Sequence, residues 1–347
     1  MRAALIEEFG KSPRVSDVPD PKCPPDGVLV EIKACGVCRS DHHAWSGVDP
    51  RISLPHVGGH EFAGIIVETG ANVSRFSVGD RVTAPFILGC GVCPDCLSGE
   101  ATICDHQQVI GFTQWGAFAD HIAIDRADFN LVHLPDGLQF EHAAAMGCRL
   151  TTAWRALTTR ANLQAGEWVA IHGTGGIGLS AILVAQALGA RVIATDIDDE
   201  KLSLARDLGA ELVVNARTTG EVADTVREMT GGGAHVSVDA LGITETFDNS
   251  IRSLRKLGRH VQIGMPVGQH KTVALPLLEL VYLRQISILG TRGMSAGQFS
   301  PLLKLVENGT IDPTQLVSRT VGLEDLGTEL ENLTNFSGVG IAVINRF

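Results

Sequence analysis

The sequence predicts an α/β protein: a doubly wound parallel sheet joined to a mostly antiparallel, barrel-like domain. Two observations carry this prediction. Short strand-like segments separated by Gly, Pro and Asp dominate residues 1–153, whereas strands and helices alternate regularly over residues 154–291. A chain of 347 residues also suits about two domains better than one.

In the first domain we expect strands rich in branched residues. Such segments alternate with turn residues in a way that is typical of paired antiparallel strands rather than of helices. The segments are 28–37, 61–70, 80–86 and 117–124.

In the second domain each apolar strand is followed by a helical stretch. The expected strands are 167–173, 191–196, 211–216, 235–242, 259–266 and 286–293, and the first two helices are 177–189 and 198–209. This rhythm predicts a parallel sheet with helices on both faces. Residues 292–347 begin with a helix and end in a strand-like piece, and we expect this segment to return to the first domain.

Charge and hydropathy exclude several classes of protein. The formal net charge of −11 disfavours a nucleic-acid or anionic-membrane partner, since both need basic patches. No apolar run approaches the ~18 residues of a membrane-spanning helix. Glu7 and Glu8 interrupt any secretory signal, so a cytoplasmic protein is expected.

A glycine-rich turn follows the first strand of the second domain. Gly173, Gly175 and Gly178 fit G-x-G-x-x-G within the stretch that also contains Gly176 and Ile177, and Asp196 ends the next strand. In this context the pattern indicates a Rossmann dinucleotide site, with the pyrophosphate at the helix N-terminus. Asp196 would bind the adenosine ribose and repel a 2′-phosphate, which favours NAD over NADP. The alternative is a turn that only allows close packing.

Four cysteines lie close together in residues 89–105, with the spacing C-x₂-C-x₂-C-x₇-C. Cys90, Cys93, Cys96 and Cys104 can wrap one tetrahedral Zn²⁺ and leave no open position, which indicates a structural zinc. An iron–sulfur cluster or a chance cluster is the alternative.

A second group of metal-binding residue types is scattered. Cys38, the adjacent pair His60 and Glu61, and Cys148 come from three separate segments, and spacing alone does not group them. Singly, His60 could be an ordinary hydrogen-bonded histidine and Cys148 a core cysteine.

Five motifs in this order resemble the medium-chain zinc-dependent alcohol dehydrogenases, closest to the bacterial and yeast tetrameric type. They are CGVCRSDHHAW, GGHEFAG, the four-cysteine segment, MGCRLTTAW and GTGGIG. The resemblance implies that Cys38, His60 and Cys148 hold a catalytic Zn²⁺, that Glu61 is an alternative ligand, and that Asp41 orients the histidine. Two Zn²⁺ per chain and NAD are therefore the expected cofactors.

The resemblance also implies roles beside the metal. Ser40 would contact the alcohol oxygen and His43 would pass its proton to solvent. Cofactor contacts are implied for Arg39, Thr152, Lys201, Leu241, Ile263, Gly264 and Leu289, and substrate contacts for Phe86, Trp45 and Trp115. One departure is the last strand, where the family's pyrophosphate-binding arginine is replaced by Ile341 or Ala342.

The expected function is reversible hydride transfer between an alcohol and NAD, giving an aldehyde or a ketone, in a homo-tetramer or dimer. Primary, secondary, allylic and aromatic alcohols all remain open as substrates. A polyol or other zinc-dependent reductase of the same fold is the alternative within this class, disfavoured because polyol dehydrogenases usually lack the Cys148 ligand. A non-enzymatic zinc-binding module is the alternative from another class, and the acidic charge opposes it.

Overall fold

The computed structural model describes residues 1–335 and 338–347, which form two compact units. The first unit comprises Met1–Thr151, Gly293–Gly309 and Pro313–Phe347, and the second comprises Thr152–Arg292 and Thr310–Asp312. The boundaries expected from sequence, 153/154 and 291/292, lie close to these divisions.

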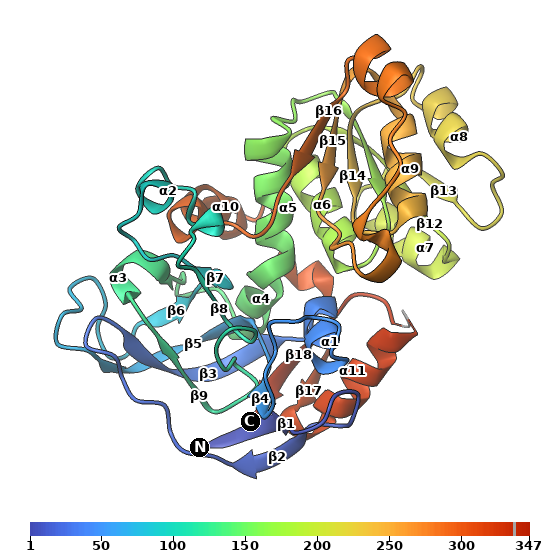
Figure 1. Ribbon diagram of the computed structural model, residues 1–347. Helices are drawn as coiled ribbons and strands as arrows, with labels where there is room; N and C mark the ends of the chain where they lie inside the picture. Colours follow the sequence, from blue (N-terminus) through green and yellow to red (C-terminus); the bar gives the residue numbers. More distant parts are fainter. Residues whose placement is uncertain (336–337) are drawn as a thin grey trace. The chain divides into compact units, whose positions relative to one another are not determined.

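The first unit is built mainly of antiparallel strands (Figure 1). A small sheet has the order β2–β1–β4, a large one the order β10–β6–β5–β3–β18–β17 with β9 also paired to β3, and β7 pairs with β8. The strands are β1 (Arg2–Ile6), β2 (Arg14–Asp17), β3 (Val28–Gly36), β4 (His56–Val57), β5 (Glu61–Thr69), β6 (Arg81–Thr83), β7 (Ile87–Leu88), β8 (Gln108–Val109), β9 (His121–Ile124), β10 (Val132–His133), β17 (Val317–Gly322) and β18 (Ile341–Arg346).

Strand β3 organises this unit. Its buried and half-buried residues alternate as far as Ala34, which is the pattern of a strand with one face on the core. The C-terminal strand β18 pairs with it in antiparallel register, Ile344 opposite Cys35, so the end of the chain completes the sheet begun near its start. Phe62, Ile66 and Phe118 are fully buried in the core beside it.

Helices in the first unit are short. They are α1 (Arg39–Trp45), α2 (Pro94–Leu97), α3 (Ala127–Asn130), α4 (Phe140–Ala145), α10 (Phe299–Glu307) and α11 (Leu326–Thr334). The strand expected over 80–86 is shorter, since it ends at Thr83 ahead of Pro85, which has no N–H for a sheet.

The second unit contains one six-stranded parallel sheet of order β13–β12–β11–β14–β15–β16 (Figure 1). Its strands are β11 (Trp168–His172), β12 (Arg191–Asp196), β13 (Leu212–Asn215), β14 (Ala234–Asp239), β15 (Leu254–Gln262) and β16 (Ser287–Gly290). The helices between them are α6 (Gly176–Ala187), α7 (Asp199–Asp207), α8 (Val222–Met229) and α9 (Thr244–Arg252), while α5 (Thr151–Arg155) carries the chain into the unit.

This strand order explains the doubly wound arrangement. The chain runs outward from β11 to β13 and then returns to place β14 on the other side of β11. Because parallel crossovers are right-handed, the helices of the two halves cover opposite faces. All of β11 is buried, as expected for a central parallel strand. The predicted fold class is confirmed.

One strand of this sheet differs from the expected elements. Strand β15 begins at Leu254, earlier than expected, because its register shifts between Ala234 and Val236 and lets Leu254 pair with Ala234. Among the described residues, no helix has both the length and the apolar character needed to cross a membrane.

The glycine turn after β11 is sterically demanding. Gly173 has a φ of +95°, in the left-handed region that favours glycine. A Cβ on Gly178 would lie 1.9 Å from the Gly173 carbonyl oxygen, whereas a Cβ on Gly175 would meet nothing within 4 Å.

We therefore predict that Gly178→Ala destabilises the protein by ~2–3 kcal/mol or more, since the turn must shift to admit the methyl group. Gly175→Ala is the matched control, and it should change the free energy of unfolding by less than about 1 kcal/mol. Urea denaturation followed by circular dichroism measures both. Equal effects from the two variants would contradict the packing argument.

Candidate functional site

The four-cysteine segment forms a compact sulfur cluster. The Sγ atoms of Cys90 and Cys96 are 3.9 Å apart, and those of Cys93 and Cys104 are 3.7 Å apart. A tetrahedral zinc with Zn–S bonds of ~2.3 Å requires S···S separations of about 3.8 Å. Hydrogen bonds from the N–H groups of Val92 and Cys93 lower the pKa of Cys90 to about 6, whereas burial raises the pKa of Cys96 to about 12.

The scattered group also comes together, entirely within the first unit. One ligand atom from each of Cys38, His60, Glu61 and Cys148 lies within 4.8 Å of every other. Cys38 precedes helix α1, and the adjacent pair lies at the start of β5. Gly59 has a φ of +93°, and a Cβ there would lie 2.6 Å from the Phe118 backbone nitrogen, so a glycine is needed to bring the chain into His60.

Asp41 holds these segments in place. Its Oδ1 accepts hydrogen bonds from His60 Nδ1 at 2.9 Å and from the Gly59 N–H at 3.1 Å, and its Oδ2 accepts from the Cys38 N–H at 2.8 Å. Although burial opposes the charged imidazole, Asp41 raises the pKa of His60 well above its ordinary value. A carboxylate on one ring nitrogen directs the other nitrogen toward a ligand.

The other nitrogen of His60 supports a metal at this place. His60 Nε2 is buried and, among the described residues, has no hydrogen-bond partner. A buried polar atom without a partner is costly, and coordination removes that cost. Two thiols and one imidazole are a donor set that suits zinc with a fourth position open. The side chains therefore fit a catalytic Zn²⁺.

Glu61 is held by a partner that sequence reasoning missed. Its Oε2 pairs with the guanidinium of the buried Arg149, and its Oε1 accepts from Arg149 Nε at 3.1 Å and from the Cys148 N–H at 3.0 Å. Burial raises the pKa of Glu61 to about 7, against the pull of Arg149. The only signal in the sequence is that Arg149 follows a candidate ligand.

Aromatic side chains surround the metal ligands. The rings of Phe86 and Phe112 pack edge-on against His60, with centroid distances of 5.6 and 5.4 Å. Phe86 was expected here, and Phe112 was not. Trp45 belongs to a different cluster, the core beside strand β3, where its Nε1 donates to the Lys11 carbonyl at 2.6 Å. Its indole is therefore part of that core and not of the group around His60. Trp115, the third aromatic residue expected to contact substrate, is 38% exposed.

Helix α1 carries the residues expected to move a proton. Ser40 Oγ lies 4.0 Å from Cys38 Sγ. His43, three residues further on, shares its helix face with Ser40. Burial and the Arg39 charge lower the pKa of His43. The neighbouring His42 bonds to Thr334 Oγ1 at 3.1 Å, and burial lowers its pKa to about 4.

The residues expected to bind cofactor are distributed over both units. Arg39 lies in the first unit, where its guanidinium donates to the Leu333 carbonyl. In the second unit, Thr152 is buried in α5 and Lys201 is half-buried in α7, while Leu289 lies in the edge strand β16. Ile341 and Ala342 are buried in β18.

At the glycine turn after β11, Asp196 links the turn to strand β12. Its Oδ2 accepts from the N–H and hydroxyl of Thr174 at 2.7 and 2.9 Å. Its Oδ1 accepts from the N–H groups of Ile197 and Asp198 at 2.8 and 3.2 Å. The carboxylate therefore shapes the loop itself.

A second carboxylate does the same at the end of β14. Asp239 is fully buried, and its Oδ1 accepts from the N–H groups of Leu241 and Gly242, each at 2.9 Å. Its carbonyl oxygen accepts from the N–H groups of Ile263 and Gly264 at 3.1 and 2.8 Å. One residue thus orders both loops at which backbone contacts to the cofactor are expected, and sequence reasoning missed it.

Comparison with known proteins identifies both units. Residues 24–136 match the family model described as the alcohol dehydrogenase GroES-like domain, and residues 176–308 match the model described as zinc-binding dehydrogenase. An alcohol dehydrogenase of Geobacillus stearothermophilus is 40% identical over 293 residues, covering 84% of each chain.

Solved structures agree with this. The crystal structure of an NAD-dependent alcohol dehydrogenase superposes with a TM-score of 0.91 at 33% identity, covering 100% of both chains. A zinc-binding dehydrogenase from Sinorhizobium meliloti 1021, bound to NADP, superposes with a TM-score of 0.86 at 28% identity, covering 99% of this chain and 98% of that one.

Two separate ligand groups predict two Zn²⁺ per purified chain, measured by plasma emission spectrometry. Cys38→Ala should lose one Zn²⁺ and keep the thermal stability of the fold. Cys93→Ala should lose the other and unfold at lower temperature, because metal binding in a closed site contributes to folding. One Zn²⁺ in the intact chain, or the same loss of stability in both variants, would contradict the assignment.

Proposed function

Since this chain belongs to the zinc-dependent medium-chain alcohol dehydrogenase family, we propose that it catalyses the reversible, NAD-linked oxidation of an alcohol to an aldehyde or a ketone. The first unit is proposed as the catalytic domain with the structural zinc, and the second as the NAD-binding domain. The observation that carries the proposal is the buried His60 Nε2, without a partner among the described residues, beside the thiols of Cys38 and Cys148.

Cys38, His60 and Cys148 would hold the catalytic Zn²⁺. When bound, this ion supplies Lewis-acid chemistry at the substrate oxygen. The protein's own contribution is geometric and electrostatic. The rings of Phe86 and Phe112 pack against the imidazole of His60 and would keep water from it, which would strengthen electrostatic interactions in the site. Arg149 neutralises Glu61, so the thiolates need not share the site with an uncompensated carboxylate.

Proton movement is proposed for helix α1. The Ser40 hydroxyl, close to Cys38 Sγ, would receive the alcohol proton and pass it on, since a hydroxyl cannot hold a proton at neutral pH. His43 would accept it. Because burial and Arg39 lower the pKa of His43, its neutral, proton-accepting form persists below the ordinary value of 6.5.

The nicotinamide cofactor is proposed to bind along the carboxyl ends of the parallel strands. The backbone at Gly173, Gly175 and Gly178 would approach the pyrophosphate. A ribose hydroxyl would take the place of the Thr174 hydroxyl on Asp196, because the structure already uses about four acceptor positions of that carboxylate.

A direct test of the function follows the formation of NADH from NAD⁺ with a panel of primary, secondary, allylic and aromatic alcohols. The zinc-replete protein should reduce NAD⁺ with at least one of them. Cys38→Ala should be inactive, while Cys23→Ala, at a cysteine outside both metal groups, should keep full activity. Equal turnover by Cys38→Ala and the unaltered protein would refute the proposal.

We predict that Asp196 sets a preference for NAD over NADP. Asp196→Gly removes a negative charge that would face the 2′-phosphate of NADP. The ratio of kcat/KM with NAD to kcat/KM with NADP should therefore fall by roughly tenfold to a hundredfold. Thr174→Val separates this effect from loop anchoring, since it breaks the hydroxyl contact and keeps the charge. If Thr174→Val narrows the ratio as much, or if the unaltered enzyme prefers NADP, the carboxylate does not have this role.

We predict that His43→Gln lowers kcat for alcohol oxidation by about tenfold at acidic to neutral pH, because the proton acceptor is lost. The deficit should shrink at high pH, where hydroxide can take the proton. The measurement is a pH profile of kcat, with zinc content and NAD affinity as controls that should not change. A profile that overlays that of the unaltered enzyme would exclude His43 from the proton path.

A homo-tetramer or dimer is also proposed. The segment Leu277–Leu283 carries four strongly exposed apolar side chains and precedes β16, the edge strand of the parallel sheet. An unpaired edge and exposed apolar residues favour self-association. The exposed residues are Leu277, Leu278, Tyr282 and Leu283.

Light scattering should therefore give a multiple of the 36.8 kDa chain mass, and Tyr282→Glu should shift the distribution toward monomer by placing a charge on that surface. Val78→Glu, at a valine that is 63% exposed and lies outside this surface, is the control. A monomeric mass for the unaltered chain at micromolar concentration would remove the proposal.

A further inference from the structure

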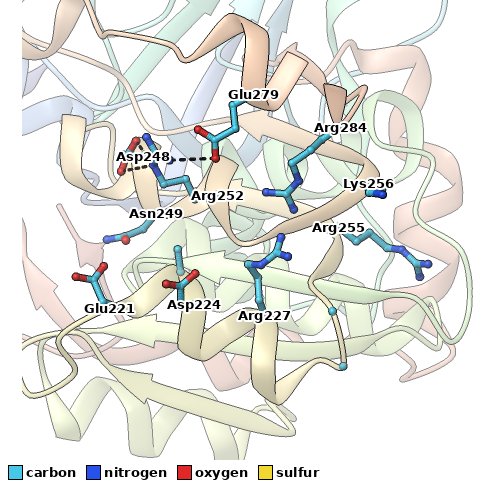
Figure 2. Close-up of a pocket in the computed structure, with 13 residues that line it drawn as sticks. Glu221, Asp224, Arg227, Asp248, Asn249, Arg252, Arg255, Lys256, Glu279 and Arg284 are labelled. Carbon is cyan, nitrogen blue, oxygen red and sulfur yellow. Dashed lines mark hydrogen bonds and ion pairs between the residues drawn. The ribbon is translucent and has the colours of Figure 1, made fainter. Parts of the chain in front are cut away.

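A charged pocket lies in the second unit, away from the glycine turn. Its volume is about 880 Å³, and five cationic side chains line it: Arg227, Arg252, Arg255, Lys256 and Arg284 (Figure 2). Arg255 and Lys256 lie at the start of β15, so the pocket is at the amino edge of the parallel sheet. The glycine turn follows the end of β11 and is therefore at the opposite edge.

Two guanidinium groups converge in this pocket. Arg227 at the end of α8 and Arg284 after Leu277–Leu283 point toward each other in Figure 2. Both donate to one acceptor, the Leu254 carbonyl oxygen, from Arg227 at 3.0 Å. Sharing one oxygen brings the two positive charges close together, and burial followed by the charge of Arg227 lowers the pKa of Arg284.

Among the residues described here, no carboxylate lies within ion-pair distance of Arg227, Arg284 or Lys256, and Glu279, although near enough to favour the charged form of Arg284, is 3.9 Å from Arg252. Arg252 is the cation that is paired, with Asp248 at 2.8 Å. Arg255 turns instead to His235 Nε2 at 2.7 Å.

The remaining acids define where an anion could lie. Glu221 and Asp224 line the side of the pocket far from Arg284 in Figure 2. We call the part of the pocket lined by Arg227, Arg284 and Lys256 its basic end. Arg227 alone could be explained as a cation capping helix α8. A capping role does not explain why Arg284, which comes from another element, joins it on the same oxygen.

We propose that the basic end of this pocket binds the phosphate group of a small phosphorylated anion. Two guanidinium groups offer several N–H donors in fixed planes, which match phosphate oxygens bidentately, and Lys256 adds a third charge. The protein as a whole is acidic, with a net charge of −11, so an anion held here is held by this local arrangement. The site is separate from the proposed NAD site.

Calorimetric titration with inorganic pyrophosphate, in saturating NAD⁺ so that the glycine turn is filled, tests this. One pyrophosphate should bind per chain, with inorganic phosphate binding more weakly. Arg227→Gln and Arg284→Gln should each weaken binding about tenfold or more. Arg206→Gln, at an exposed arginine of α7 outside the pocket, should not.

Two further arms make the result decisive. Asp224→Asn removes a repelling charge and should tighten binding, so weaker binding in this variant would contradict the proposal. Citrate that binds as tightly as pyrophosphate would show that the pocket responds to charge alone, and this would contradict a site for phosphate. No pyrophosphate binding at millimolar concentration, or binding unaffected by both arginine variants in folded protein, would overturn the site whether or not the chain oxidises alcohols.

Discussion

The hydrogen bond between Asp41 and His60 is the interaction on which the metal site depends. Asp41 is 2% exposed and bonds to the N–H groups of two segments as well as to the imidazole. It therefore fixes helix α1, the turn before β5 and the ring orientation together. One nitrogen of His60 is committed to Asp41, and the other has no partner among the described residues, so it is available to a metal ion. The other groups of the site lie around that nitrogen or around Cys38: the thiols of Cys38 and Cys148, the Ser40 hydroxyl, and the rings of Phe86 and Phe112.

In the second unit, too, carboxylates accept hydrogen bonds from backbone N–H groups, here at the carboxyl ends of the parallel strands. Asp196 and Asp239 each end a parallel strand and accept hydrogen bonds from N–H groups of the loop that follows. A carboxylate can bind several donors at once, so one residue determines the backbone of an entire loop. The backbone expected to contact a dinucleotide is thus ordered before any ligand arrives, which reduces the entropy lost on binding.

The sequence predicted best what is local in the chain. The four cysteines at 90–104 and the glycine turn at 173–178 are visible because short spacing itself dictates their geometry. The group around His60 could be predicted only through family resemblance, since its members come from three distant segments. Arg149, Phe112 and Asp239 gave no usable signal: a buried ion pair, an aromatic contact and a loop anchor depend on which strands become neighbours. Trp45 illustrates the converse, because helix α1 turns its indole into the core while Ser40 faces the metal ligands.

The central claim, that Cys38, His60 and Cys148 hold a second zinc distinct from the four-cysteine zinc, is tested most directly by X-ray absorption at the zinc edge of the intact enzyme. Six thiolates shared by two ions predict an average of about three sulfur ligands per zinc at ~2.3 Å, with about one nitrogen or oxygen ligand at ~2.0–2.1 Å. In His60→Ala the average should move toward four sulfur ligands, as the remaining zinc would be the structural one. An all-sulfur environment in the unaltered enzyme would contradict the account.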